Sequence, residues 1–114
     1  MKISIFLTLI LCSLGAYSKD ETGGYAILGR GTISCGAVAA ANEKSNKVGN
    51  LAISEWVNGY LTAFNILTYG AYDLTKNVDL DGRKQWILKY CKDNPLEMLA
   101  VAAKRLADEL EAKQ

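Results

Sequence analysis

The sequence predicts a small all-α domain, a bundle of about four helices with one disulfide, preceded by an extended Gly-rich arm. Three observations indicate this fold class. Apolar residues recur at the 3.6-residue period of core-facing helices in the second half of the chain. Pro95 is the only proline, so nothing interrupts long helices before it. Two cysteines remain after removal of a predicted leader, which is the number that one disulfide needs. At 114 residues the chain is long enough for a single domain only.

Residues 1–18 have the pattern of a secretory signal peptide. Lys2 supplies a positive start, residues 3–14 are apolar, and Ala16 and Ser18 are the small residues before the expected cleavage site. The apolar stretch is shorter than the run of about 20 residues that a membrane span needs. A lipoprotein cysteine at position 12 is disfavoured because the bulky Leu11 precedes it. We therefore expect export to the periplasm of a Gram-negative-type envelope, with no membrane attachment after cleavage.

The cysteine count also favours an oxidising compartment. Removing 18 of the 114 residues leaves 96, with Cys35 and Cys91 as the only cysteines. Two cysteines can pair in one way, and closing a loop of 56 positions stabilises a chain by about 4 kcal/mol. A redox-active pair is the alternative, but there is no C-x-x-C spacing and no His to activate a thiolate. A structural disulfide is the favoured interpretation.

Residues 19–34 are predicted to form the extended arm, with a short strand over residues 25–28. Four glycines within this segment break any helix: Gly23, Gly24, Gly29 and Gly31. Residues 35–114 then make up the helical domain. Its first helix is expected over the Ala-rich residues 35–43, with Thr32 or Ser34 as its N-cap. Several turn-forming residues between positions 42 and 50 predict a turn before the next element.

The strongest helical signal covers residues 51–69. Its apolar stripe consists of Ile53, Val57, Tyr60, Phe64 and Leu67, widened by Trp56. Gly59 lies inside this helix at a cost of about 1 kcal/mol relative to Ala, which suggests a close approach of another backbone unless it is incidental. Tyr69 and Tyr72 flank Gly70 in the following loop and are candidate exposed contacts for a partner.

Two shorter helices complete the expected domain. The third begins near Asp79 or Asp81 and ends at Asp93, with an apolar face of Trp86, Ile87, Tyr90 and Cys91. The fourth is predicted to open at residue 94, with Asn94 as its N-cap, Pro95 at the first helical position and Glu97 completing a capping box. Its apolar stripe is Leu96, Leu99, Ala103, Leu106 and Leu110. We assign Trp56, Tyr60, Trp86 and Tyr90 to the core.

Composition and motifs argue against catalysis and against nucleic-acid binding. The 13 basic residues fall to 12 without Lys2 and then balance the 12 acidic residues, so no basic surface for nucleic acid is expected. There is no His and no nucleophile, phosphate-loop or zinc motif. Residues 77–82 resemble the start of an EF-hand loop, but Leu88 occupies the position of the essential Glu. We expect no enzyme activity, no cofactor and no metal.

Several residues form a pattern typical of a known family: Cys35, Trp56, Gly59, Tyr60, Asp81, Tyr90, Cys91, Asn94 and Pro95. Over roughly residues 34–110 the chain resembles the HdeA/HdeB family of small periplasmic helical proteins. The resemblance implies a four-helix fold, one disulfide between the two cysteines, and the acid-activated chaperone role of the best-known members. The partners would then be unfolding client proteins.

A second resemblance keeps another function open. The pair Gly59-Tyr60 and the spacing from Tyr90 and Pro95 to Ala103, Leu106 and Leu110 are similar to the Tai-type immunity proteins of type VI secretion. This resemblance implies a partner of a different kind, a toxic effector that the protein would bind and neutralise. We therefore expect a non-enzymatic protein-binding protein, a stress chaperone or alternatively an immunity protein, and a homodimer remains open.

Overall fold

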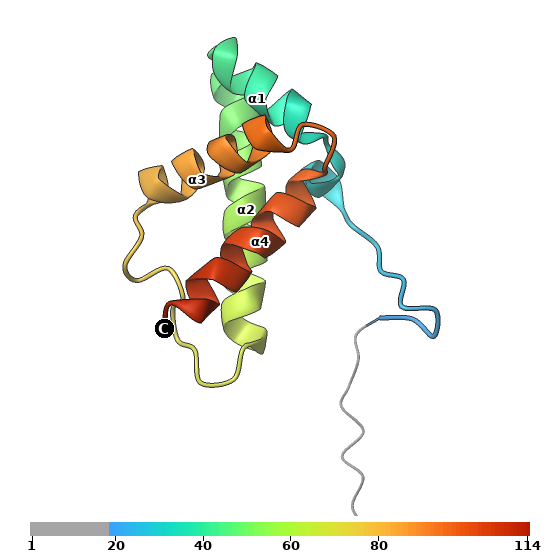
Figure 1. Cartoon of the computed structure of the whole chain (residues 1–114), viewed down its shortest axis with the longest axis vertical. Coiled ribbons are helices and arrows are strands. Elements are labelled where there is room, and N and C mark those ends of the chain that lie inside the picture. The colour runs from blue at the N-terminus through green and yellow to red at the C-terminus, as the bar shows by residue number, and fades with distance from the viewer. Residues whose placement is uncertain (1–18) are drawn as a thin grey trace, which may run out of the picture.

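Four helices follow one another in residues 19–114, which are the residues described by the computed structural model (Figure 1). They are α1 (Cys35–Glu43), α2 (Lys47–Leu67), α3 (Leu80–Asp93) and α4 (Leu99–Ala112), and a short 3-10 turn, η1 (Gly29–Thr32), precedes them. Within the described residues there is no strand, and Ser34 and Met98 form an isolated β-bridge. The predicted all-α bundle with an extended arm is confirmed, whereas the leader predicted at residues 1–18 lies outside the described residues.

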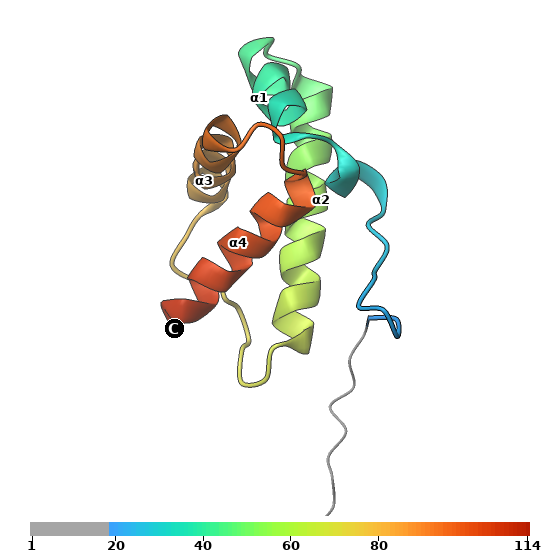
Figure 2. The ribbon, with the colours of Figure 1, turned by 45° about the vertical axis from the view of Figure 1, so that its right-hand side comes forward.

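The longest helix, α2, contacts α1, α4 and η1 (Figures 1 and 2). α4 crosses it diagonally, and α1 packs against its first turns. α3 packs mainly against α1 and α4 rather than along α2. The arm joins the bundle through η1, which contacts α2 and α4. As a result, α1 and the α2–α3 loop lie at opposite ends of the domain.

Three helices begin at polar caps. The Oγ of Ser34 accepts a hydrogen bond from the Ala37 backbone N–H at 3.1 Å, so Ser34 rather than Thr32 caps α1. Asn46 caps α2 and Asp79 caps α3 through equivalent bonds of 2.9 and 2.7 Å. The predicted start of α2 at residue 51 is therefore four residues late, because a residue that we read as part of a turn acts as the N-cap.

The predicted start of α4 at residue 94 is wrong. Asn94 ends α3 instead, where its Nδ2 donates to the Tyr90 carbonyl at 2.9 Å. Residues 94–97 form a turn, closed by the hydrogen bond from the Glu97 N–H to the Asn94 carbonyl at 3.2 Å. The turn pairs with the start of α1, where Cys35 N–H donates to the Glu97 carbonyl at 2.7 Å. Pro95 and Glu97 consequently lie outside the helix, and Leu96, predicted in the apolar stripe, is exposed.

α4 supplies the largest share of the core. Seven of its residues are buried, and several are alanines, which let neighbouring helices approach closely: Leu99, Ala100, Ala102, Ala103, Leu106, Ala107 and Leu110. They pack with Ile53, Val57 and Leu61 of α2, with Ile87 of α3 and with both cysteines. The predicted core positions Ile53, Val57, Ala103, Leu106 and Leu110 are thus confirmed, while Leu67 is exposed.

The arm attaches to α2 at a single tryptophan. The indole N–H of Trp56 donates to the Leu28 carbonyl at 2.7 Å. Gly31, which is buried, lies against the same ring, and a Cβ at this position would overlap Trp56 and the side chain of Ile27. This geometry explains why the predicted strand at residues 25–28 is wrong: the segment meets a helix, and no other strand is present among residues 19–114 to pair with it.

Gly59 does not mark a close approach. A Cβ built at this position meets no atom within 4 Å, so the glycine is incidental to packing. The close approach that we expected at Gly59 occurs at Gly31 instead.

These two glycines should respond in opposite ways to the same substitution. Gly31→Ala should lower the free energy of unfolding by about 1–3 kcal/mol, because the added methyl overlaps Trp56. Gly59→Ala should raise it by about 0.5–1 kcal/mol, because alanine favours the helix and meets open space. Urea unfolding of both variants measures the two effects. Destabilisation by Gly59→Ala would contradict the packing described for α2.

Candidate protein-binding surface

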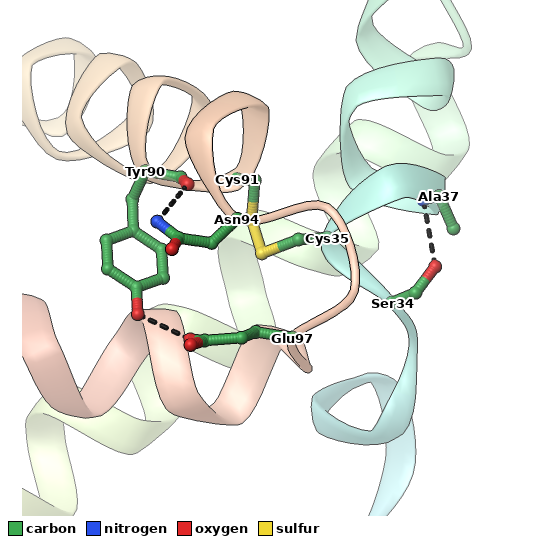
Figure 3. Close-up of a disulfide and its surroundings, with 7 residues drawn as sticks. All are labelled: Ser34, Cys35, Ala37, Tyr90, Cys91, Asn94 and Glu97. Carbon is green, nitrogen blue, oxygen red and sulfur yellow. Dashed lines mark hydrogen bonds between the residues drawn. A yellow bond between two sulfur atoms is a disulfide. The ribbon is translucent and has the colours of Figure 1, made fainter.

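The predicted disulfide is present and buried. Cys35 is the first residue of α1 and Cys91 lies in the last turn of α3, with their Cα atoms 4.5 Å apart (Figure 3). Both residues have no exposed surface. A disulfide without solvent access is shielded from exchange with external thiols, which fits the structural role and not the redox role.

A network of hydrogen bonds surrounds the disulfide, as Figure 3 shows. The Tyr90 hydroxyl donates to the Glu97 carboxylate, and this bond, together with burial, raises the pKa of Tyr90. Gly36 N–H donates to the Pro95 carbonyl at 2.9 Å. Tyr90, Asn94 and Pro95, which carried the family resemblance, therefore join α1, the end of α3 and the start of α4. We call residues 33–36 and 90–99 the clasp.

The aromatic motif residues of α2 also support packing. Trp56 and Tyr60 stack along α2 with ring centroids 5.8 Å apart, and Phe64 continues the stack at 6.4 Å from Tyr60. Burial raises the pKa of Tyr60. The aromatic residues assigned to the core are only partly buried and cover its edge.

On α3, Trp86 stacks on Tyr90 with centroids 5.4 Å apart, and its indole N–H donates to the Glu109 carboxylate of α4 at 2.8 Å. Sequence reasoning missed this link between α3 and α4, because no local sequence pattern indicates that the partly buried Glu109 accepts a hydrogen bond from a residue 23 positions away. Asp81 is exposed in the first turn of α3, where a negative charge suits the helix dipole.

Four strongly exposed apolar side chains gather where α2 ends. Ile66 and Leu67 are 77% and 82% exposed, and Tyr69 and Tyr72 are essentially fully exposed. We call these four residues the α2-end surface. The exposure predicted for the two tyrosines is confirmed. Leu67, which was predicted in the apolar stripe, is exposed because α4 diverges from α2 towards this end and leaves the last turn of α2 uncovered (Figures 1 and 2).

The loop that carries the tyrosines is held on both sides. Ala71 N–H donates to the Thr68 carbonyl at 3.2 Å, and Gly70 between them has a φ of 79°, a value that glycine adopts without strain. Leu74 is 3% exposed, and its N–H donates to the Asn65 side chain at 3.0 Å. The tyrosines therefore project from an anchored loop.

Polar residues border this surface. Asp73 accepts two hydrogen bonds from Thr75, at 2.8 Å from the backbone and 2.7 Å from the hydroxyl, which lowers the pKa of Asp73. A shallow hollow beside the tyrosines is also lined by Lys76 and Glu111. Exposed apolar groups with a polar rim are typical of protein interfaces.

Residues 19–114 contain no cluster of three or more His, Cys, Asp or Glu that could hold a metal ion. In the segment that resembled an EF-hand, Asp79 is engaged as the cap of α3. No helix in the described part of the chain is long and apolar enough to cross a bilayer.

Comparison with known proteins found no matching family model, no similar curated protein and no similar solved structure. The two family resemblances therefore stay predictions.

Loss of the disulfide should weaken the whole domain. We expect Cys35→Ser with Cys91→Ser to lower the free energy of unfolding by about 2–5 kcal/mol, because the pair closes a long loop and three helix ends meet at it. Urea unfolding followed by far-ultraviolet circular dichroism measures the change. Asp81→Asn, on the exposed side of α3, serves as the control. Equal stability of the cysteine variant and the wild type would contradict a structural role.

Proposed function

We propose that this protein is an exported, non-enzymatic protein that binds unfolding client proteins in the periplasm, a stress chaperone of the HdeA type. The observation that carries the proposal is the α2-end surface: four large apolar side chains exposed within seven consecutive residues. Such a patch is costly to leave in water, since each Å² of buried apolar area stabilises a complex by about 25 cal/mol.

The chemistry of this surface suits clients of varied sequence. Ile66 and Leu67 offer aliphatic contacts, and Tyr69 and Tyr72 combine an apolar ring with a hydroxyl that pairs with polar backbone groups. Recognition of this kind needs exposed apolar side chains and exposed backbone in the client, and an unfolding protein presents both. It does not need a defined sequence in the client.

Acid would enlarge the binding surface. Hydrogen bonds from Lys113 and from the Trp86 indole lower the pKa of Glu109, so the ionised carboxylate stabilises the contact between α3 and α4. This stabilisation is present above the ordinary carboxyl pKa of 4.5 and is lost as the pH falls through the lower pKa of the folded state. With all carboxylates neutral, the 12 basic side chains outside the predicted leader also repel one another. Loosening of α4 would expose its apolar face, while the disulfide keeps the chain from complete unfolding.

The first test is suppression of client aggregation. We expect the wild-type protein to reduce light scattering of an acid-stressed client at about pH 3, and Tyr69→Ser with Tyr72→Ser to lose more than half of that effect. Val48→Ser with Leu51→Ser is a matched control, because those residues are also exposed but lie at the other end of α2. No suppression by the wild type, or equal losses in both double variants, would overturn the proposal.

The pH dependence of stability tests the acid step separately. Glu109→Gln should lower stability at pH 7, and its difference from the wild type should shrink as the pH falls below 4.5, because the wild-type carboxyl then becomes protonated. Lys113→Gln removes the same ion pair from the other side and should show the same trend. Urea unfolding at a series of pH values gives both profiles. A difference that stays constant from neutral to acid pH would contradict this role for Glu109.

An immunity protein is the second candidate function, and one observation favours it. The α2-end surface exists in the folded state, on a loop fixed by the turn at Gly70 and by the buried Leu74, so no acid opening is needed to bind a partner. A rigid surface suits one dedicated partner better than many clients. Pull-down with secreted effectors at pH 7 separates the two functions, since a tight complex with a single effector supports immunity and excludes a general chaperone.

A further inference from the structure

A cavity of about 190 Å³ lies among α1, α2 and α3, away from the α2-end surface. It arises because α3 packs against α1 and α4 and leaves space beside α2. Its walls are mainly aliphatic, formed by Val38, Ile53, Val57, Leu80, Ile87 and Leu88. The charged residues that line it are Arg83 and Lys84, and no carboxylate is among its lining residues. Four neutral polar residues, Asn42, Asn50, Ser54 and Asn58, complete the lining, so the cavity combines an aliphatic wall with polar groups and two positive charges.

Arg83 has unused hydrogen-bonding capacity. Its Nη1 donates to the Val78 carbonyl at 2.8 Å, and its Nη2 makes a long contact of 3.4 Å with the Asn58 side-chain oxygen. Its Nε is buried and has no partner. Within residues 19–114 no carboxylate lies within ion-pair distance of Arg83. Arg83 also lines a second hollow with Asp73 and Asp79, and its charge contributes to the lowered pKa of Asp73. A partly desolvated guanidinium with neutral partners is stabilised by an anion, and its planar fork matches a carboxylate.

We propose that this cavity binds a small monocarboxylate with an apolar body. The carboxylate meets the guanidinium of Arg83 and the ammonium of Lys84, and the apolar body lies among Val57, Ile87 and their aliphatic neighbours. A cavity of about 150 Å³ holds one benzene ring, so the observed volume takes a single ring or a branched alkyl group with its acid. Ligands with an added ammonium group are disfavoured by the two cations.

This site is independent of the proposed chaperone function. The cavity is lined by residues 50–58 of α2, whereas the α2-end surface begins at Ile66. If this protein binds clients but no monocarboxylate, only the cavity proposal fails. If it binds the monocarboxylate but no clients, only the chaperone proposal fails.

Hydrocinnamate is a suitable probe because it carries one ring, a short chain and one carboxylate. Titrated into the full mature chain, it should shift the NMR signals of the residues that line the cavity, in a saturable manner. Hydrocinnamamide, which is neutral, and phenylpropylamine, which is positive, should bind at least tenfold more weakly, because a charge-assisted hydrogen bond is worth about 1.5–3 kcal/mol. No shifts, shifts located elsewhere, or equal binding of the amide would overturn the proposal.

Variants test the two parts of the site. Arg83→Gln and Lys84→Gln should each weaken hydrocinnamate, with the larger loss, about tenfold, at Arg83. Arg83 also donates hydrogen bonds to Val78 and Asn58, so its substitution could disturb the fold. Ser54→Leu is therefore a second test of the site, because it fills the cavity without removing these hydrogen bonds and should abolish hydrocinnamate binding. Thr62→Leu makes the same kind of change on α2 outside the cavity and should leave affinity unchanged. Retained affinity in Ser54→Leu would overturn the assignment of the site.

Discussion

The pairing of two extended segments next to one disulfide is the constraint on which the remaining structure depends. Leu99 N–H donates to the Ile33 carbonyl at 2.9 Å, beside the bond from Cys35 to Glu97, and Cys91 is joined to Cys35. The starts of α1 and α4 and the end of α3 therefore meet at one point. Because α4 leaves this point in a set direction, it crosses α2 and buries there most of the apolar face that makes the core.

The clasp and the α2-end surface lie apart in the domain. Backbone pairing and the covalent bond hold one end, whereas the α2-end surface lies where α4 has diverged from α2 and the tyrosines are covered by nothing. Apolar side chains that are exposed in the folded protein can bury their surface against a partner. The separation between the disulfide-linked helix ends and an exposed apolar surface is the physical basis of the proposed chaperone function.

Sequence patterns could predict the fold class, the cysteine pair and most of the core, since Ile53, Val57, Leu106 and Leu110 follow helical periodicity. They failed where a contact between distant segments overrides a local preference. Asn94 and Pro95 have the sequence of a helix start, but this segment forms a turn whose backbone pairs with residues 33–36. The sequence suggested a close approach at Gly59 within a helix, whereas the contact occurs between Gly31 of the arm and Trp56, which lie far apart in the chain. The cavity beside Arg83 depends on which helices leave space between them, and no motif encodes this.

α4 follows the other three helices in the sequence, and this order has a consequence for folding. Synthesis proceeds from the N-terminus, so α1, α2 and α3 emerge before the helix that completes their core. Cys35 likewise cannot form its disulfide until Cys91, 56 positions later, has been synthesised. Until then the apolar face of α2 has no α4 to pack against and Cys35 is a free thiol. The core of α1, α2 and α3 therefore stays incomplete until the residues of α4 have been synthesised, and a chain truncated before Leu99 lacks the helix that completes it.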